Sequence, residues 1–155
     1  IVRQIIHLPI YQSYKSRLFA ASTTRAGGVS KGLYSSMNLC HYVGDNRENV
    51  AINRNIFCTS LGIKTEHFIL PHQTHGNKVV NIDPDFLLQT EEVQQKKLEG
   101  VDGLITNEHQ VCIGISTADC LPILLFDQKT EAIGAVHAGW RGTIARIVTN
   151  VIHLM

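Results

Sequence analysis

Apolar runs of strand length alternate with short groups of small and reactive residues between positions 101 and 143. Two of the runs, residues 122–126 and 131–136, predict buried strands. The four residues between them, 127–130, are polar and short enough to form the turn of a β-hairpin. Pro122 fits the first position of its strand, because proline can begin a strand without removing an interior ladder hydrogen bond.

The turn length sets the expected pairing of the two strands. With four residues in the turn, Phe126 faces Glu131, and six positions further out Cys120 faces His137. Directly opposed residues have Cβ atoms about 5 Å apart, so the hairpin predicts a thiol and an imidazole meeting at one of its ends, where loops carry function. The alternative is that the two side chains simply pack at a strand end. A slip of one residue would turn one of them to the other face.

The hydrophobic pattern predicts further elements before this hairpin. Residues 18–24 form a strand that runs into a glycine-rich turn, residues 25–30. Asp45 or Asn46 caps a helix that runs to about Leu61, and Gly62 ends it. The expected buried side of this helix consists of Val50, Ile56, Phe57 and Leu61.

The middle and the end of the chain give weaker patterns. Residues 67–70 and 78–82 predict strands on either side of a segment that contains His72 and His75. Residues 83–100 are charged and glutamine-rich, which favours a solvated helix or a mobile loop. Residues 143–155 predict an amphipathic helix. Its expected apolar side consists of Ile144, Ile147, Val148, Val151 and Leu154.

Length and composition indicate one globular domain over residues 1–155. The hydrophobic fraction is 44%, the charged fraction is 17% and the net charge is +1. This charge implies no nucleic acid partner, and no apolar run approaches the 18 or so residues of a membrane span. The four cysteines have irregular spacing without a CxxC pair, and the first residues do not resemble a signal peptide. We therefore expect a reducing, cytoplasmic setting.

Several side chains are candidates for chemistry. His75, Cys120 and His137 match a three-ligand zinc site, in which a fourth position stays open for water or substrate. Asp119 precedes the cysteine and could move protons. Arg25 adds charge to the glycine-rich turn, whose backbone N–H groups could converge on an anion. The alternatives are incidental histidines and a plain β-turn with a solvated arginine.

Five motifs give a resemblance to a known family. They are Thr-Thr-Arg-Ala-Gly-Gly-Val-Ser (23–30), Met-Asn-Leu (37–39) with Gly-Asp (44–45), His-Gln-Thr-His-Gly (72–76), Thr-Ala-Asp-Cys-Leu-Pro (117–122) and Val-His-Ala-Gly-Trp-Arg-Gly-Thr (136–143). In this order they resemble the YfiH family, also called laccase-domain or polyphenol oxidoreductase proteins. The last two motifs are very specific.

The resemblance implies an α/β fold with mixed sheets, layered as an α/β/β/α sandwich. It implies a zinc site on His75, Cys120 and His137. It also implies phosphorolysis of adenosine, inosine and methylthioadenosine, and deamination of adenosine, so the expected partners are a small nucleoside and phosphate. In this hypothesis Arg25 and Arg141 hold phosphate, because guanidinium matches its geometry, and Asp119 transfers protons.

Three alternatives stay open. The first is a metal-free cysteine hydrolase with Cys120 as nucleophile and His137 as its base. The second is a non-catalytic protein that keeps the metal as a structural clip. The third follows family descriptions, peptidoglycan editing or copper laccase, although none of the eight histidines forms a His-x-His pair and zinc is expected over copper. The family is longer than this sequence, so we expect a C-terminally truncated version of the fold, and Thr74 replaces a usual apolar β-branched residue.

Overall fold

The computed structural model of the protein describes residues 5–155. The chain divides into two compact units, residues 1–65 and 66–155. The expected single domain over 1–155 stays a prediction. Within the described residues, no helix is long and apolar enough to cross a membrane.

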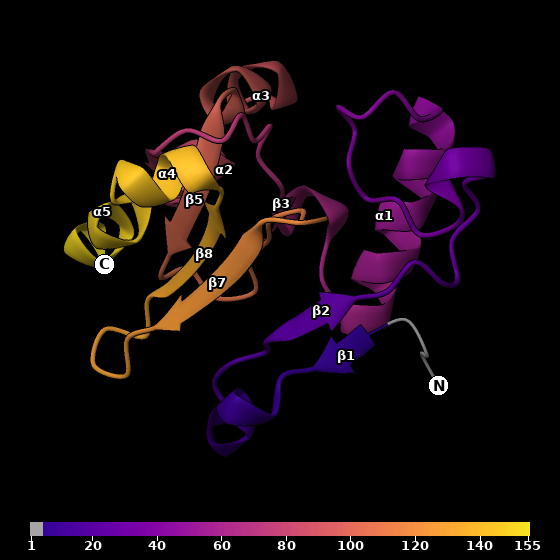
Figure 1. Ribbon diagram of the computed structural model, residues 1–155. Helices are drawn as coiled ribbons and strands as arrows, with labels where there is room; N and C mark the ends of the chain where they lie inside the picture. The colour runs from indigo at the N-terminus through magenta and orange to yellow at the C-terminus, as the bar shows by residue number, and fades with distance from the viewer. Residues whose placement is uncertain (1–4) are drawn as a thin grey trace. The chain divides into compact units, whose positions relative to one another are not determined.

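The first unit contains a two-stranded antiparallel sheet and one long helix (Figure 1). Its elements are β1 (Ile5–His7), the 3-10 helix η1 (Pro9–Tyr14), β2 (Ala21–Thr23), the 3-10 helix η2 (Gly32–Tyr34) and α1 (Arg47–Leu61). The strand expected at residues 18–24 is therefore shorter than predicted.

Helix α1 begins and ends where the sequence predicts. The side chain of Asn46 accepts hydrogen bonds from the backbone N–H groups of Glu48 and Asn49, which would otherwise lack partners. Gly62 ends the helix with φ of 68°, a left-handed conformation that costs glycine little. Val50 and Phe57 are buried as expected, whereas Ile56 and Leu61 are only partly buried.

The second unit contains the remaining elements. They are β3 (Phe68–Ile69), β4 (Lys78–Asn81), α2 (Pro84–Leu87), α3 (Glu91–Leu98), β5 (Val101–Thr106), β6 (Cys112–Ile113), β7 (Leu121–Phe126), β8 (Ile133–Ala138), α4 (Trp140–Ile144) and α5 (Ile147–Leu154), with the 3-10 helix η3 (Thr65–His67) at the junction of the units. Strands β3 and β6 pair in parallel, and four strands form a sheet in the order β4-β5-β8-β7.

The four-stranded sheet mixes parallel and antiparallel pairs, because β4 and β5 are parallel while β5–β8 and β8–β7 are antiparallel. All six residues of β5 are buried, since apolar clusters cover both faces. One cluster contains Phe86 from α2 and Leu98 from α3. The other contains Ile147 and Val151 from α5, and Figure 1 shows α5 beside β5 and β8. The predicted fold class, α/β with mixed sheets, is confirmed.

The predicted register of the hairpin is wrong by two residues. Phe126 pairs with Ile133 instead of Glu131, and His137 pairs with Pro122 instead of Cys120. The connection is longer than four residues because Asp127 accepts hydrogen bonds inside it, including one from the backbone N–H of Thr130. Side chains alternate between faces with period two, so a shift of two residues keeps Cys120 on the face of His137.

Two helical predictions also need correction. The charged segment 83–100 forms α2 and α3, and most of α3 is exposed, as the solvated-helix prediction expected, but Phe86 and Leu98 belong to the core. The expected helix over 143–155 is interrupted at Arg146, which has a left-handed φ of 58°. The break separates α4 from α5, so Ile144 and Leu154 are exposed whereas Ile147 and Val151 are buried.

Candidate metal centre

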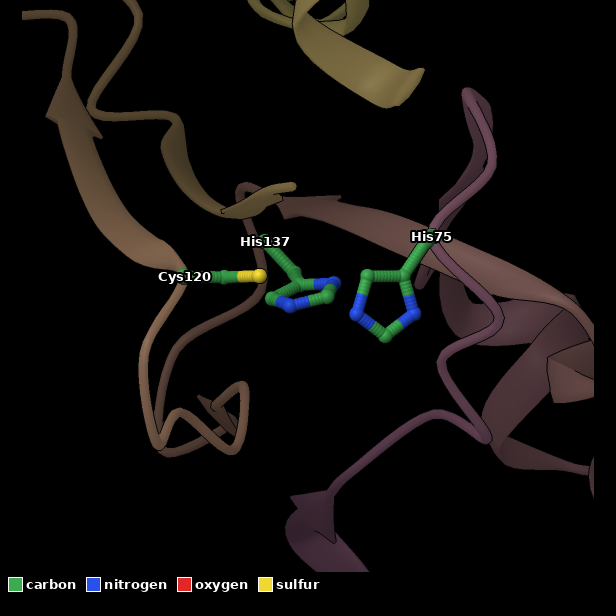
Figure 2. A group of neighbouring side chains, drawn as sticks. All are labelled: His75, Cys120 and His137. Atoms are coloured by element: carbon green, nitrogen blue, oxygen red, sulfur yellow. The ribbon is translucent and has the colours of Figure 1, made fainter. Parts of the chain in front are cut away.

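The three predicted ligands meet in the second unit. His75 lies in the loop between β3 and β4, Cys120 directly precedes β7, and His137 is in β8. One donor atom from each lies within 4.8 Å of the other two. Figure 2 shows the His137 ring between the Cys120 sulfur and the His75 ring, and the two imidazole centroids are 4.8 Å apart in an edge-to-face arrangement. Their role as metal ligands stays a prediction.

A buried carboxylate that the sequence analysis did not single out completes the cluster. Asp102 in β5 is fully buried, and its Oδ1 lies 2.7 Å from Nδ1 of His137. It also accepts hydrogen bonds from three consecutive backbone N–H groups, those of Thr74, His75 and Gly76. The signal available in the sequence was a single acidic residue inside an apolar strand, where a charge needs dedicated partners.

Two glycines allow the segment after β8 to approach the ligand loop. A Cβ atom on Gly139 would lie 2.9 Å from Cδ2 of His75 and 3.5 Å from the sulfur of Cys120. A Cβ atom on Gly142 would lie 2.6 Å from the carbonyl oxygen of Gly76. The distances of 2.9 Å and 2.6 Å are shorter than van der Waals contact, so both positions need glycine for close approach rather than for conformational freedom.

Hydrogen bonds at Ser116 and Thr117 fix the start of the loop that ends at Cys120. The side-chain amide of Gln73 donates to the carbonyl of Ser116 at 2.8 Å, and its oxygen accepts from the backbone N–H of Ser116 at 2.7 Å. The hydroxyl of Thr117 donates to the carbonyl oxygen of Cys120. The His75 loop and the cysteine loop are therefore connected to each other before any ion is considered.

The donor set suits a zinc ion. Three atoms no more than 4.8 Å apart have a common point within about 2.8 Å of each, and zinc bonds to nitrogen and sulfur are about 2.0–2.3 Å. A contraction of under about 1 Å would therefore close the site. Two imidazoles and one thiolate are ligands that zinc accepts, and three protein ligands leave a fourth position.

The other predicted site residues are placed as follows. Asp119 is exposed beside Cys120. Arg141 is exposed in α4, with its guanidinium 5.2 Å from the ring centroid of Trp140. Arg25 lies in the first unit, where its guanidinium donates to the carbonyls of Leu33 and Ser35. Their chemical roles stay predictions.

The second candidate histidine of the loop has a different partner. Nδ1 of His72 lies 2.8 Å from a carboxylate oxygen of Glu99, and His72 is not among the three clustered residues. In a His-x-x-His segment outside a helix, the sequence alone does not decide which imidazole turns toward the cysteine.

The fold and the site define a mixed α/β protein with a His–Cys–His cluster that could hold a metal ion. A family model described as multi-copper polyphenol oxidoreductase laccase matches residues 19–155. The chain belongs to this family, and the predicted YfiH or laccase-domain membership is confirmed.

Curated relatives carry enzyme names. The purine nucleoside phosphorylase of Bacteroides thetaiotaomicron is 43% identical over 130 residues, which cover 84% of this chain and 48% of that protein. Adenosine deaminase RL5, from an unknown prokaryotic organism, is 40% identical over 136 residues, covering 88% of this chain and 52% of that protein. The chain therefore spans about half the length of the curated relatives it matches.

Solved structures share the fold. YlmD from Geobacillus stearothermophilus superposes with a TM-score of 0.84 at 30% identity, covering 99% of this chain and 56% of that one. The YfiH protein of Bacillus licheniformis gives a TM-score of 0.85 at 22% identity, with the same coverage. The second likeness shows the fold alone.

Proposed function

We propose that the protein is a zinc-dependent purine nucleoside phosphorylase that also deaminates adenosine. The observation that carries the proposal is the convergence of His75, Cys120 and His137 within 4.8 Å. It is supported by relatives named purine nucleoside phosphorylase and adenosine deaminase. The substrates are adenosine, inosine or methylthioadenosine, with phosphate or water as the second reactant.

In this proposal His75, Cys120 and His137 would hold the ion. Bound zinc would supply Lewis acidity and would lower the pKa of water at the site to about 7. Phosphorolysis breaks the bond between the ribose C1′ and the purine nitrogen and forms a bond from C1′ to a phosphate oxygen. Deamination replaces the exocyclic amino group by the oxygen of water and releases ammonia.

We assign two polar side chains of the second unit to the steps around the ion. Asp119, exposed beside the thiolate ligand, transfers protons to or from the reacting group. Arg141 holds phosphate, because it is an exposed residue whose guanidinium lies over the Trp140 ring, 5.2 Å from the centroid. The phosphate role of Arg25 stays a prediction from the sequence, because Arg25 belongs to the first unit, where its Nε and Nη2 donate to backbone carbonyls.

The test combines metal analysis with turnover. The protein is expressed from its complete reading frame, purified without added metal, analysed for zinc and copper, and incubated with adenosine with and without phosphate. We expect one zinc per site, phosphate-dependent release of adenine with ribose 1-phosphate, and phosphate-independent formation of inosine. Zinc-containing protein that forms neither product would overturn the activity, and stoichiometric copper would overturn the choice of metal.

A matched pair of cysteine variants links activity to the cluster. Cys120→Ser replaces the thiolate ligand and should abolish zinc retention together with both activities. Cys112→Ser makes the same change in β6, away from the cluster, and should preserve them. Equal activity of the two variants would contradict a role for the thiolate.

A metal-free cysteine hydrolase is the second candidate. It is favoured by one observation, the contact of Asp102 with His137 beside Cys120, which resembles the order of groups in cysteine hydrolases. Iodoacetamide distinguishes the two functions. Under the zinc proposal the metal protects Cys120 from alkylation and chelator exposes it, whereas Cys58, which is 1% exposed, stays unmodified in both states. Rapid alkylation in the presence of bound zinc would favour the hydrolase.

A further inference from the structure

The contacts of Asp102 divide evenly between its two oxygens. Oδ1 accepts from the backbone N–H of His75 at 2.9 Å and lies 2.7 Å from Nδ1 of His137. Oδ2 accepts from the backbone N–H groups of Thr74 at 3.2 Å and Gly76 at 2.8 Å. A fully buried carboxylate is tolerated when hydrogen bonds replace its water shell, and here the partners all belong to the segments that carry the two imidazoles.

The sheet places this carboxylate through a local irregularity. Along β4 and β5, Lys78 pairs with Val101 and Val79 pairs with Gly103, so the register shifts at Asp102. Such a shift leaves Asp102 without a partner residue in β4 and interrupts the regular alternation of the strand. On the other side of β5, Gly103 pairs with Val136 in antiparallel register. Continuing that register by one step sets Asp102 opposite His137.

The same carboxylate supports an unusual backbone conformation. His75 has a φ of 63°, in the left-handed region that is unfavourable for a residue with a Cβ. Three successive N–H groups, those of residues 74–76, converge on the Asp102 carboxylate. These charge-assisted hydrogen bonds hold the loop in the turn that directs the His75 ring toward His137.

We propose that Asp102 is the positioning residue of the metal centre and that it sets the geometry of both imidazole ligands. It orients His137 through the ring, because a hydrogen bond at Nδ1 leaves Nε2 for the ion. It orients His75 through the backbone of the loop. The inference rests on the proposed metal function and adds the group on which two of the three ligands depend.

The variant Asp102→Asn tests this role. One oxygen becomes an NH2 donor, and whichever way the amide turns, it faces at least one backbone N–H group that loses its acceptor. We expect zinc affinity, measured by competition with a chromophoric chelator, to fall about 10–100-fold. Amide hydrogen exchange at residues 74–76 should become faster. Unchanged affinity in a folded variant would overturn the proposal.

Thr106→Val is the matched control in the same strand. Thr106 is 1% exposed, and its hydroxyl donates to the carbonyl of Ile82 at 2.6 Å. Its replacement removes a buried hydrogen bond at the other end of β5 and should lower stability without weakening zinc binding. An equal loss of zinc affinity in both variants would show that general destabilisation, and not positioning, explains the effect.

A measurement on the unaltered protein covers the case in which Asp102→Asn does not fold. Long-range ¹H–¹⁵N correlation spectra of the zinc-loaded protein, with His137 assigned by the loss of its signals in His137→Gln, show which ring nitrogen binds the metal. We expect a proton on Nδ1 and zinc on Nε2, and zinc on Nδ1 would overturn the proposal. Protein that binds no zinc would instead refute the proposed function itself, so the two failures are distinguishable.

Discussion

Replacing Gly139 by alanine separates metal binding from folding. The backbone of Gly139 has φ of −70° and ψ of 164°, which any residue adopts without strain. The added Cβ would lie 2.9 Å from Cδ2 of His75, where carbon atoms prefer about 3.5–4.0 Å. The ring must therefore move by roughly 0.5 Å or more, beyond the tolerance of about 0.2 Å expected for a metal–ligand distance.

The position of His75, the side chain that the new Cβ displaces, determines how far stability and zinc affinity change. His75 is an exposed side chain, so its ring can turn into solvent at little cost to the fold. Alanine also restricts the unfolded chain, which stabilises by about 0.4–1 kcal/mol and offsets part of the strain. We expect unfolding free energy within about 1 kcal/mol of the original protein, and zinc affinity lower by at least about tenfold, which corresponds to 1.4 kcal/mol.

Gly134→Ala in β8 is a control with the opposite expected result, a loss of stability without a loss of zinc affinity. Its Cβ would lie 3.0 Å from a methyl group of Val151 and 3.2 Å from the sulfur of Met155, both outside the metal cluster. This substitution should lower stability by about 1–3 kcal/mol through overpacking and preserve zinc affinity. The assays are urea denaturation with chelator present and zinc competition. Equal zinc affinity of Gly139→Ala and the original protein would refute the reasoning.

Three further predictions concern other parts of the molecule. Asn53→Ala removes a buried amide that donates to Ser30 and accepts from the backbone N–H of Val29, so we expect about 2–4 kcal/mol lower stability and faster amide exchange around residues 28–38. Hydrogen bonds from Ser30 and Asn38 lower the pKa of Asp45 below 3.8; its stabilising contribution is present above pH 3.8 and disappears as the pH falls through the lower folded-state value, so Asp45→Asn should flatten the acid limb of a denaturation profile. Trp140, the single tryptophan of the sequence and 67% exposed, should be quenched by acrylamide and shielded by bound inosine; an unchanged quenching constant at saturating inosine would place the nucleoside away from Trp140.

Local sequence rules were sufficient for elements whose determinants lie close together in the chain. Asn46 determines the start of α1, because its side chain accepts hydrogen bonds from backbone N–H groups of the first turn. Gly62 determines the end, because it adopts the left-handed conformation that closes the last turn. The strands β7 and β8 follow from apolar runs in the same way, although β8 begins at Ile133 and not at residue 131. The expected ligands also meet, although the hairpin that suggested the thiol–imidazole contact has a different register.

Long-range packing decided the rest. The shift of two residues between β7 and β8 depends on the turn and on the neighbouring strand, and it preserved the contact only because side chains alternate with period two. The interruption at Arg146 lets α5 bury Ile147 and Val151 against the sheet, which the continuous helical pattern did not reveal. Long-range packing also makes Phe86 and Leu98 core residues.

The sequence by itself determined which side chains are available: two imidazoles, one thiol and the short motifs around them. Only the tertiary structure decided that the carboxylate of Asp102 lies between the segments that carry His75 and His137. A register shift against β4 skips Asp102, and its neighbour Gly103 pairs with Val136 of β8. Such a position depends on three strands at once, and no periodicity within one segment encodes it.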